Sequence, residues 1–236
     1  MQFYRRWQPV AAISFDLDDT LYDNGPAIER AEQWMLAHLR SEYLATAMLD
    51  KPRWLELKRN LLLEQPALRH DVSLARRHGI QAALMAGGMA ETRAAQEAES
   101  VFAAFLAERS KIEVSDETHA LLARLAARYP LAVITNGNLD LAQAGLADYF
   151  TLVCKAGLGS RMKPAPDMFV QVQKALGLAP DRILHVGDHP QTDVLGARLH
   201  GFKAAWLNEH QQPGEQLQLL PDVELTALGE LADLLL

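Results

Sequence analysis

Four short clusters in this sequence contain side chains whose types and spacing could do chemistry together. The clusters are Asp16-Leu17-Asp18-Asp19-Thr20, Thr135-Asn136-Gly137-Asn138, Lys163-Pro164, and Gly187-Asp188 with Asp193. A single aspartate after a strand is most often a helix cap. Four clusters, each placed at the expected carboxyl end of a strand, instead indicate one shared site, because ligands of open α/β sheets bind beyond these ends.

The clusters supply four carboxylates, those of Asp16, Asp18, Asp188 and Asp193. Brought together, these groups would repel one another, so either some are protonated or cations compensate them. A set of oxygen ligands suits a hard ion such as Mg²⁺, and no Cys or His cluster favours zinc. We therefore expect Mg²⁺ as the cofactor.

The remaining polar groups suit a phosphate. Lys163 adds a positive charge, Thr135 offers a hydroxyl, and Asn136 offers a backbone N–H that can hold phosphate oxygens. A carboxylate nucleophile, a metal and donors around the transferred group are the parts of phosphoryl transfer. The sequence therefore predicts an enzyme with this chemistry.

Apolar segments predict the strands that position these clusters. Five segments read as strands, at 10–15, 131–135, 152–154, 183–186 and 204–207. Helical patterns lie between the later ones, at 116–129, 166–176 and 192–200, and a last short helix is expected within 228–236. Alternation of this kind is typical of a doubly wound parallel sheet, and so of the α/β fold class.

The segment between the first strand and the rest has a helical period throughout. Ile28, Ala31, Met35 and Leu39 recur at helical spacing, and no strand-like segment interrupts the pattern up to about Arg109. We expect about four helices, inserted into the α/β domain. The predicted division is an α/β catalytic core of residues 1–21 and 111–236 and an all-helical domain of residues 22–110.

The composition limits the class of protein further. The chain has 236 residues and a single cysteine, which excludes an internal disulfide. Its net charge of −7 gives no global basic field that would attract nucleic acid. No apolar run reaches the roughly 18 to 20 residues of a membrane span. We expect a cytoplasmic monomer or homodimer that binds a small molecule, with neither nucleic acid nor membrane as a partner.

The four clusters resemble the four motifs of the haloacid dehalogenase-like phosphatases, in the order that this family has them. The resembling stretches are Asp16 to Leu21, Ile134 to Gly137, Lys163 to Phe169, and Gly187 to Asp193. The resemblance implies a Rossmann-like core, with the inserted helices as a cap that closes over the site and shapes the choice of substrate.

The resemblance also implies roles for individual residues. Asp16 would be the nucleophile that forms an aspartyl-phosphate, and Asp18 would protonate the leaving alkoxide and later activate water. Thr135 would bind the phosphate, and Lys163 would neutralise both the nucleophile and the phosphate. Asp188 would hold Mg²⁺ together with Asp16 and the backbone carbonyl of Asp18, while Asp193 would ligate directly or through water.

A second resemblance concerns the substrate. Phe3 to Arg5, Asp16 to Asn24 and His70 to Val72 are similar to bacterial phosphatases of flavin mononucleotide (FMN) and of 5-amino-6-(5-phospho-D-ribitylamino)uracil. The alternatives are a phosphatase of sugar phosphates or nucleotides, a phosphomutase, a dehalogenase and a binding module without activity. The acid at Asp18 argues against a dehalogenase, because halide leaves unprotonated.

Several other polar or aromatic residues are expected to have local structural roles. We expect Asp19 and Asp23 to be turn or cap groups, His189 to be solvated and His185 to lie in the core. Trp34 and Trp54 are expected to pack against other apolar residues, and Cys154 to be a small buried thiol. Arg76 and Arg77 are expected on a solvated helix face.

Overall fold

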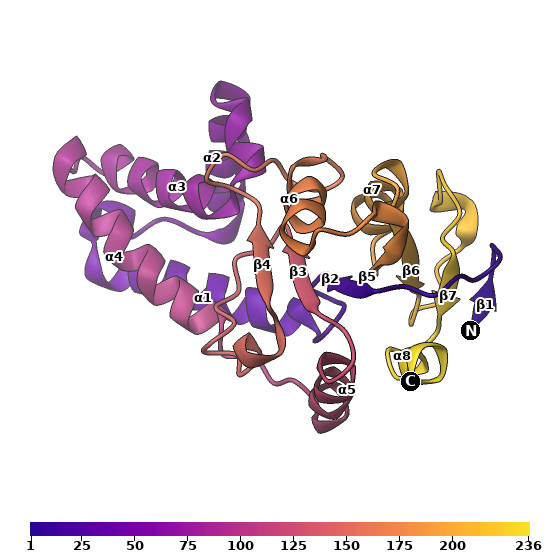
Figure 1. Ribbon diagram of the computed structural model, residues 1–236. Coiled ribbons are helices and arrows are strands. Elements are labelled where there is room, and N and C mark those ends of the chain that lie inside the picture. Colours follow the sequence, from indigo (N-terminus) through magenta and orange to yellow (C-terminus); the bar gives the residue numbers. More distant parts are fainter.

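The computed structural model describes residues 1–236, the side chain of Ala45 excepted, and is built around a seven-stranded sheet (Figure 1). The strands are β1 (Gln2–Phe3), β2 (Ala12–Phe15), β3 (Leu131–Thr135), β4 (Leu152–Lys155), β5 (Ile183–Gly187), β6 (Lys203–Leu207) and β7 (Val223–Leu225). Their order is β1-β7-β6-β5-β2-β3-β4, and β2 to β7 pair in parallel. The predicted parallel α/β sheet is confirmed.

Helices pack on both faces of the sheet because its strand residues alternate between two apolar layers. Helices α5 (Asp116–Ala126) and α8 (Glu230–Leu235) cover the face that includes Ile13 and Phe15. Helices α6 (Asp167–Leu176) and α7 (Gly196–Leu199) cover the other face, and Figure 1 shows the two pairs on opposite sides. The sheet is therefore doubly wound, as expected from the alternating pattern.

The structure differs from the sequence prediction at several elements. Strand β1, which pairs antiparallel with β7, and β7 itself were not predicted, because two- and three-residue strands are too short to show a period. The helix expected at 192–200 begins instead as a π-helical turn, Pro190–Leu195. Short 3₁₀ turns that the patterns did not predict lie at Leu44–Thr46, Pro66–His70, Ala147–Tyr149, Pro180–Arg182 and Gly214–Gln216.

The inserted segment forms four helices: α1 (Asn24–Glu42), α2 (Lys51–Glu64), α3 (Val72–Ala86) and α4 (Glu91–Arg109). The carboxylates of Asp23, Asp50 and Asp71 accept hydrogen bonds from backbone N–H groups at the starts of the first three. Apolar residues of all four helices form a cluster of their own that includes Met35, Trp54, Ile80 and Phe105. The exact division into 1–21 with 111–236 and 22–110 stays a prediction. Among the described residues, no helix is long and apolar enough to cross a membrane.

The start of α3 contacts the loops that follow β3 and β4. The Nδ2 atom of Asn138 donates to the hydroxyl of Ser73 at 3.1 Å. The backbone N–H of Leu158 donates to the carboxylate of Asp71 at 3.3 Å, and that of Met162 donates to Nδ1 of His70 at 3.4 Å. The inserted helices therefore lie over the carboxyl ends of the strands, where the four polar clusters meet.

Candidate active site

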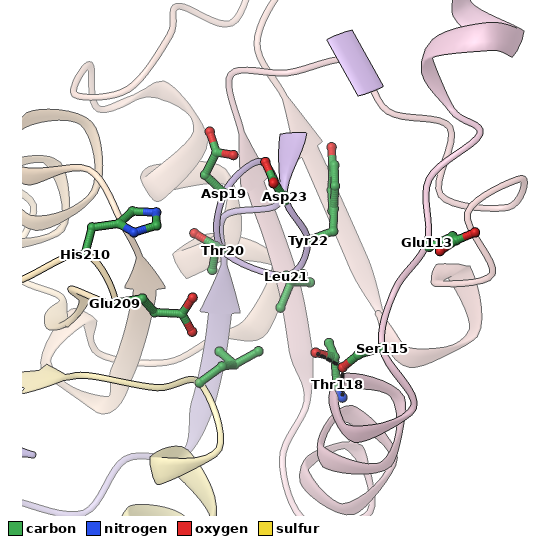
Figure 2. Close-up of a pocket in the computed structure, with 11 residues that line it drawn as sticks. Asp19, Thr20, Leu21, Tyr22, Asp23, Glu113, Ser115, Thr118, Glu209 and His210 are labelled. Carbon is green, nitrogen blue, oxygen red and sulfur yellow. Dashed lines mark hydrogen bonds between the residues drawn. The ribbon is translucent and has the colours of Figure 1, made fainter. Parts of the chain in front are cut away.

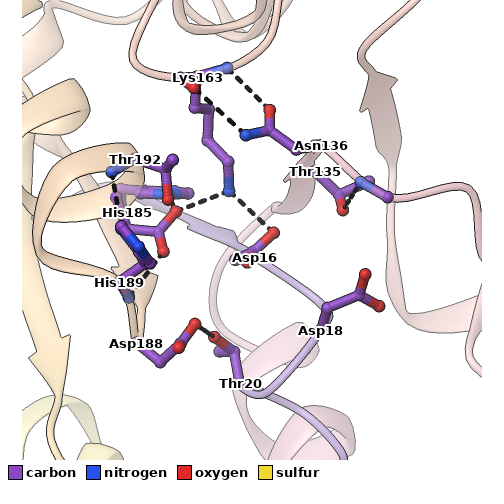
Figure 3. A network of polar contacts seen from close by, with 12 residues as sticks. Asp16, Asp18, Thr20, Thr135, Asn136, Lys163, His185, Asp188, His189 and Thr192 are labelled. Carbon is purple, nitrogen blue, oxygen red and sulfur yellow. Dashed lines mark hydrogen bonds and ion pairs between the residues drawn. The ribbon is translucent and has the colours of Figure 1, made fainter. Parts of the chain in front are cut away.

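A buried ion cluster at the carboxyl ends of β2 and β5 forms the centre of the site (Figure 3). The Nζ atom of Lys163 lies 2.8 Å from Oδ1 of Asp16 and 2.6 Å from Oδ1 of Asp193. All three residues are buried. Burial lowers the pKa of Lys163, but the two carboxylates outweigh this effect and raise it above its ordinary value, so the ammonium stays charged.

The carboxylate of Asp193 accepts hydrogen bonds from three directions. Its Oδ1 faces Lys163 Nζ and, at 3.2 Å, Nε2 of His185, while its Oδ2 accepts from the backbone N–H of His189 at 3.0 Å. A Cβ atom at Gly187 would collide with this side chain, so only glycine allows the close approach. Burial raises the pKa of Asp193, but Lys163 and His185 hold it well below its usual range.

The side chain of Asn136 holds the backbone of Lys163 in place. Its Oδ1 accepts from the Lys163 N–H at 2.7 Å, and its Nδ2 donates to the Lys163 carbonyl at 3.2 Å. The sequence indicated only the backbone N–H of Asn136 as a functional group. Its amide side chain thus has a second task, fixing the loop from which the ammonium extends.

The hydroxyl of Thr135 is prepared to donate a hydrogen bond. Thr135 ends β3, is buried, and accepts a hydrogen bond from the backbone N–H of Gly137 at 3.0 Å. Because that N–H occupies the oxygen as an acceptor, the hydroxyl proton can point toward a ligand in the adjoining cavity.

Three carboxylates form a set that can hold a cation. Oxygens of Asp16, Asp188 and Asp193 lie within 4.8 Å of one another. Burial raises the pKa of Asp16 above its usual range and that of Asp188 to about 6. Thr20 donates to Asp188 at 3.3 Å, which fixes its orientation. The raised pKa values show that the negative charges of these buried carboxylates are not fully compensated, and a set of oxygen ligands with excess negative charge fits a hard divalent cation.

The carboxylate of Asp18 faces away from this set. Its Oδ1 accepts from the Arg109 guanidinium and from the Tyr22 hydroxyl, and Arg109 also donates to that hydroxyl at 2.8 Å. Its Oδ2 faces Gly137, where any Cβ atom would be too close. Neither Arg109 nor Tyr22 was expected at the site from the sequence.

Five of the seven predicted site residues line a common cavity of about 160 Å³, and the other two, Lys163 and Asp193, are joined to it through Asp16. Its walls are Asp16, Asp18, Asp19, Thr135, Asn136, Gly137, Asp188, His189 and Thr192. A larger hollow of about 470 Å³ lies beside the Asp19–Asp23 loop, between Glu113, Ser115 and Thr118 on one side and Glu209 and His210 on the other (Figure 2). Because the ion cluster does not line this second hollow, the smaller cavity is the candidate site.

Most of the residues expected to have structural roles do have them. Asp19 accepts from the Asn24 N–H, Asp23 caps α1, His189 caps the turn that follows it, and Trp54 and Cys154 are buried in apolar clusters. Arg76 differs, because its side chain is only 12% exposed: it pairs with Glu32 and lies over the Phe105 ring.

Comparison with known proteins agrees with this geometry. A family model described as haloacid dehalogenase-like hydrolase matches residues 10–201. The chain is 36% identical to the 5-amino-6-(5-phospho-D-ribitylamino)uracil phosphatase YigB of Escherichia coli, over the full length of both chains. It is 39% identical to the phosphoserine phosphatase of Thermus thermophilus, over 63% of this chain and 60% of that one.

A solved structure shares the whole architecture. The crystal structure of a 2-haloacid dehalogenase from Pseudomonas syringae pv. Tomato superimposes with a TM-score of 0.90 and 33% identity, covering 95% of this chain and 97% of that chain. The family resemblance drawn from the four motifs is therefore confirmed. The match of the family model over most of the chain, together with the full-length relative, shows that this chain belongs to the haloacid dehalogenase-like hydrolases.

Proposed function

We propose that the chain, a phosphatase of this family, hydrolyses small phosphomonoesters through an aspartyl-phosphate on Asp16. The observation that carries the proposal is the buried contact of Asp16 with Lys163 at the wall of the 160 Å³ cavity. In this position Lys163 neutralises both the nucleophile and the phosphate. The Thr135 hydroxyl and the backbone N–H of Asn136 bind phosphate oxygens.

The reaction has two displacements at phosphorus. A carboxylate oxygen of Asp16 forms a bond to phosphorus while the bond to the leaving oxygen breaks, and Asp18 gives that oxygen its proton. Asp18 then takes a proton from water as the water oxygen attacks phosphorus. The bond between Asp16 and phosphorus breaks, and inorganic phosphate leaves. The present contact of Asp18 with Arg109 must loosen for its carboxyl to reach the leaving oxygen.

The carboxylate set of Asp16, Asp188 and Asp193 fits Mg²⁺, with the backbone carbonyl of Asp18 as a further ligand. When bound, the ion neutralises charge on the transferring phosphoryl group. Asp193 has three hydrogen bonds already, which leaves its carboxylate one free acceptor position and favours a ligand role through water.

Activity is expected to require a divalent cation and to stop when a chelator is added. Asp188→Ala should raise the Mg²⁺ concentration needed for half-maximal activity at least about tenfold, because loss of even a group that only supports a metal ligand lowers metal affinity about 10- to 100-fold. Asp19→Ala is the matched control: Asp19 lines the same cavity but is not one of the carboxylates whose oxygens lie together, so the requirement should change little. Titration of Mg²⁺ into metal-free enzyme measures both. Full activity of the metal-free wild type would contradict the charge argument.

We further propose that the substrate is 5-amino-6-(5-phospho-D-ribitylamino)uracil or FMN, which would place the enzyme in riboflavin biosynthesis. The support is the full-length similarity to YigB and the cap contacts of His70 and Asp71, which lie in a stretch that resembles these phosphatases. A cap over the site favours small substrates, because it must close around the leaving group.

A screen of phosphorylated metabolites tests the substrate. The value of kcat/KM for one of the two flavin-pathway phosphates should exceed that for simple sugar phosphates at least about tenfold, or about 1.4 kcal/mol of transition-state stabilisation. Equal or faster turnover of sugar phosphates or nucleoside monophosphates would reject this substrate and leave the phosphatase assignment intact.

The similarity to the 2-haloacid dehalogenase structure favours one other function. In that reaction a carboxylate oxygen of Asp16 would displace halide from carbon. No acid would be needed at Asp18, because halide leaves unprotonated. Displacement of halide from carbon also does not require the cation that Asp16, Asp188 and Asp193 can hold together. Halide release from 2-chloropropionate, assayed beside phosphate release, separates the two activities.

A further inference from the structure

A buried polar pair behind the ion cluster has no task in the reaction described above. Ser14 lies on β2, two residues before Asp16, and is paired in register with His185 on β5. Both residues are at most 1% exposed. The Ser14 hydroxyl lies 3.0 Å from Nδ1 of His185, and Nε2 of the same ring lies 3.2 Å from Oδ1 of Asp193. The pair therefore connects β2, through His185, to Asp193 of the ion cluster.

The donors and acceptors of this chain can be assigned from its chemistry. Asp193 is ionised beside Lys163, and an ionised carboxylate only accepts hydrogen bonds. Nε2 of His185 must therefore carry a proton, since a lone pair facing the carboxylate would be repelled. The proton on Nε2 follows from this contact whether or not Nδ1 also carries one. At the other ring nitrogen, the Ser14 hydroxyl can donate to Nδ1 or accept from it, and it also lies 3.5 Å from the Leu184 carbonyl oxygen.

We propose that His185 is a positioning residue: the N–H at its Nε2 holds Asp193 in the orientation that presents Lys163 to Asp16. The proposal rests on the proposed phosphatase mechanism, in which Lys163 neutralises the nucleophile. Ser14 contacts the opposite ring nitrogen, so both nitrogens of His185 have a polar partner and the orientation of the ring is fixed.

The geometry explains why Asp193 needs this support. Its Oδ1 receives both Lys163 and His185, so the ring and the ammonium share one oxygen. Without the N–H of His185, rotation of the carboxylate would move the oxygen on which Lys163 rests. The ammonium also contacts Asp16, so the rotation would shift charge at the nucleophile.

Nitrogen-15 spectroscopy of the metal-free protein at neutral pH tests the tautomer without any activity assay. The signals of His185 are identified by their loss in His185→Gln, and two-bond proton–nitrogen correlations distinguish the two ring nitrogens. We expect a proton on Nε2 in the wild type and also in Ser14→Ala, because Asp193 still faces that nitrogen. A ring protonated at Nδ1 alone would overturn the proposal.

Two substitutions of His185 test the positioning role. The amide nitrogen of Gln can take the place of Nε2 and donate to Asp193, whereas the shorter Asn reaches only toward Ser14. Both lose the edge-to-face contact of the ring with Phe169, whose centroid is 5.4 Å away, so their packing losses are matched. With p-nitrophenyl phosphate and Mg²⁺, we expect His185→Asn to lower kcat about tenfold with little change in KM, and His185→Gln to stay within about threefold of wild type.

Equal losses of kcat in the two variants would show a merely structural role and overturn the proposal. If neither variant folds, the presence or absence of the proton on Nε2 of the wild-type ring decides. Absence of phosphate release by the wild type would instead count against the proposed function, and the spectroscopic result is independent of it.

Discussion

Asp16→Asn is expected to lower kcat for phosphate release by at least about a thousandfold, because an amide cannot form the aspartyl-phosphate. Asparagine has nearly the same shape as aspartate, so the loss of activity should come without a loss of fold. Phosphate release under saturating substrate and Mg²⁺ measures the effect. In the wild type, mass spectrometry of acid-quenched enzyme should show the phosphoryl group on the peptide that contains Asp16.

The matched control for this substitution is Asp19→Asn. Asp19 also lines the cavity, but its carboxylate is occupied as an acceptor for the Asn24 N–H and it is exposed. It should keep kcat within a few-fold of wild type. The assignment of the nucleophile fails if Asp16→Asn retains near-normal turnover, or if the phosphoryl group is found on another residue.

Lys163→Met is expected to abolish most activity and to destabilise the fold. The ammonium lies between Asp16 and Asp193, both buried, and its removal leaves their charges uncompensated. Breaking a buried ion pair by removing one partner costs about 3–5 kcal/mol. Urea denaturation of the metal-free protein at neutral pH should show a decrease of this size, and kcat should fall more than about a hundredfold because the phosphate loses its cation.

Lys174→Met serves as the control, since Lys174 is exposed on α6 and makes no ion pair within the described part of the chain. Its stability and kcat should match those of the wild type. Unchanged stability of Lys163→Met would mean that Asp16 or Asp193 takes up a proton at little cost, and it would contradict the expected loss of about 3–5 kcal/mol.

Much of the fold could be predicted because its central strands are short, uniformly apolar and bounded by polar residues. The strand expected at 131–135 coincides with β3, and that at 183–186 falls within β5. The edge strands β1 and β7 could not be predicted, since a strand of two or three residues has no readable period and depends on its neighbour.

The site residues that could be predicted from the sequence are those that belong to motifs at the ends of strands. The structure brings Asp16, Lys163 and Asp193 into direct contact, as the charge argument anticipated. Arg109 could not be foreseen: it is separated from Asp18 by 91 residues and resembles any basic residue in the last turn of a helix. Only the folded chain shows that this last turn of α4 lies against the first motif.

The carboxylate set also has a consequence for proton binding and folding. In the unfolded chain Asp188 titrates near 3.8, whereas burial raises its pKa in the folded chain to about 6, and burial raises that of Asp16 as well. As the pH rises from about 4 to about 6 for Asp188, and to about 7 for Asp16, the unfolded chain releases these protons before the folded chain does, so the free energy of unfolding falls over that range. Asp193 contributes in the opposite direction: Lys163 lowers its pKa in the folded chain, so its ionisation adds to the free energy of unfolding. A group of charges assembled for reactivity thus opposes folding at neutral pH, and the apolar layers on the two faces of the sheet must outweigh it.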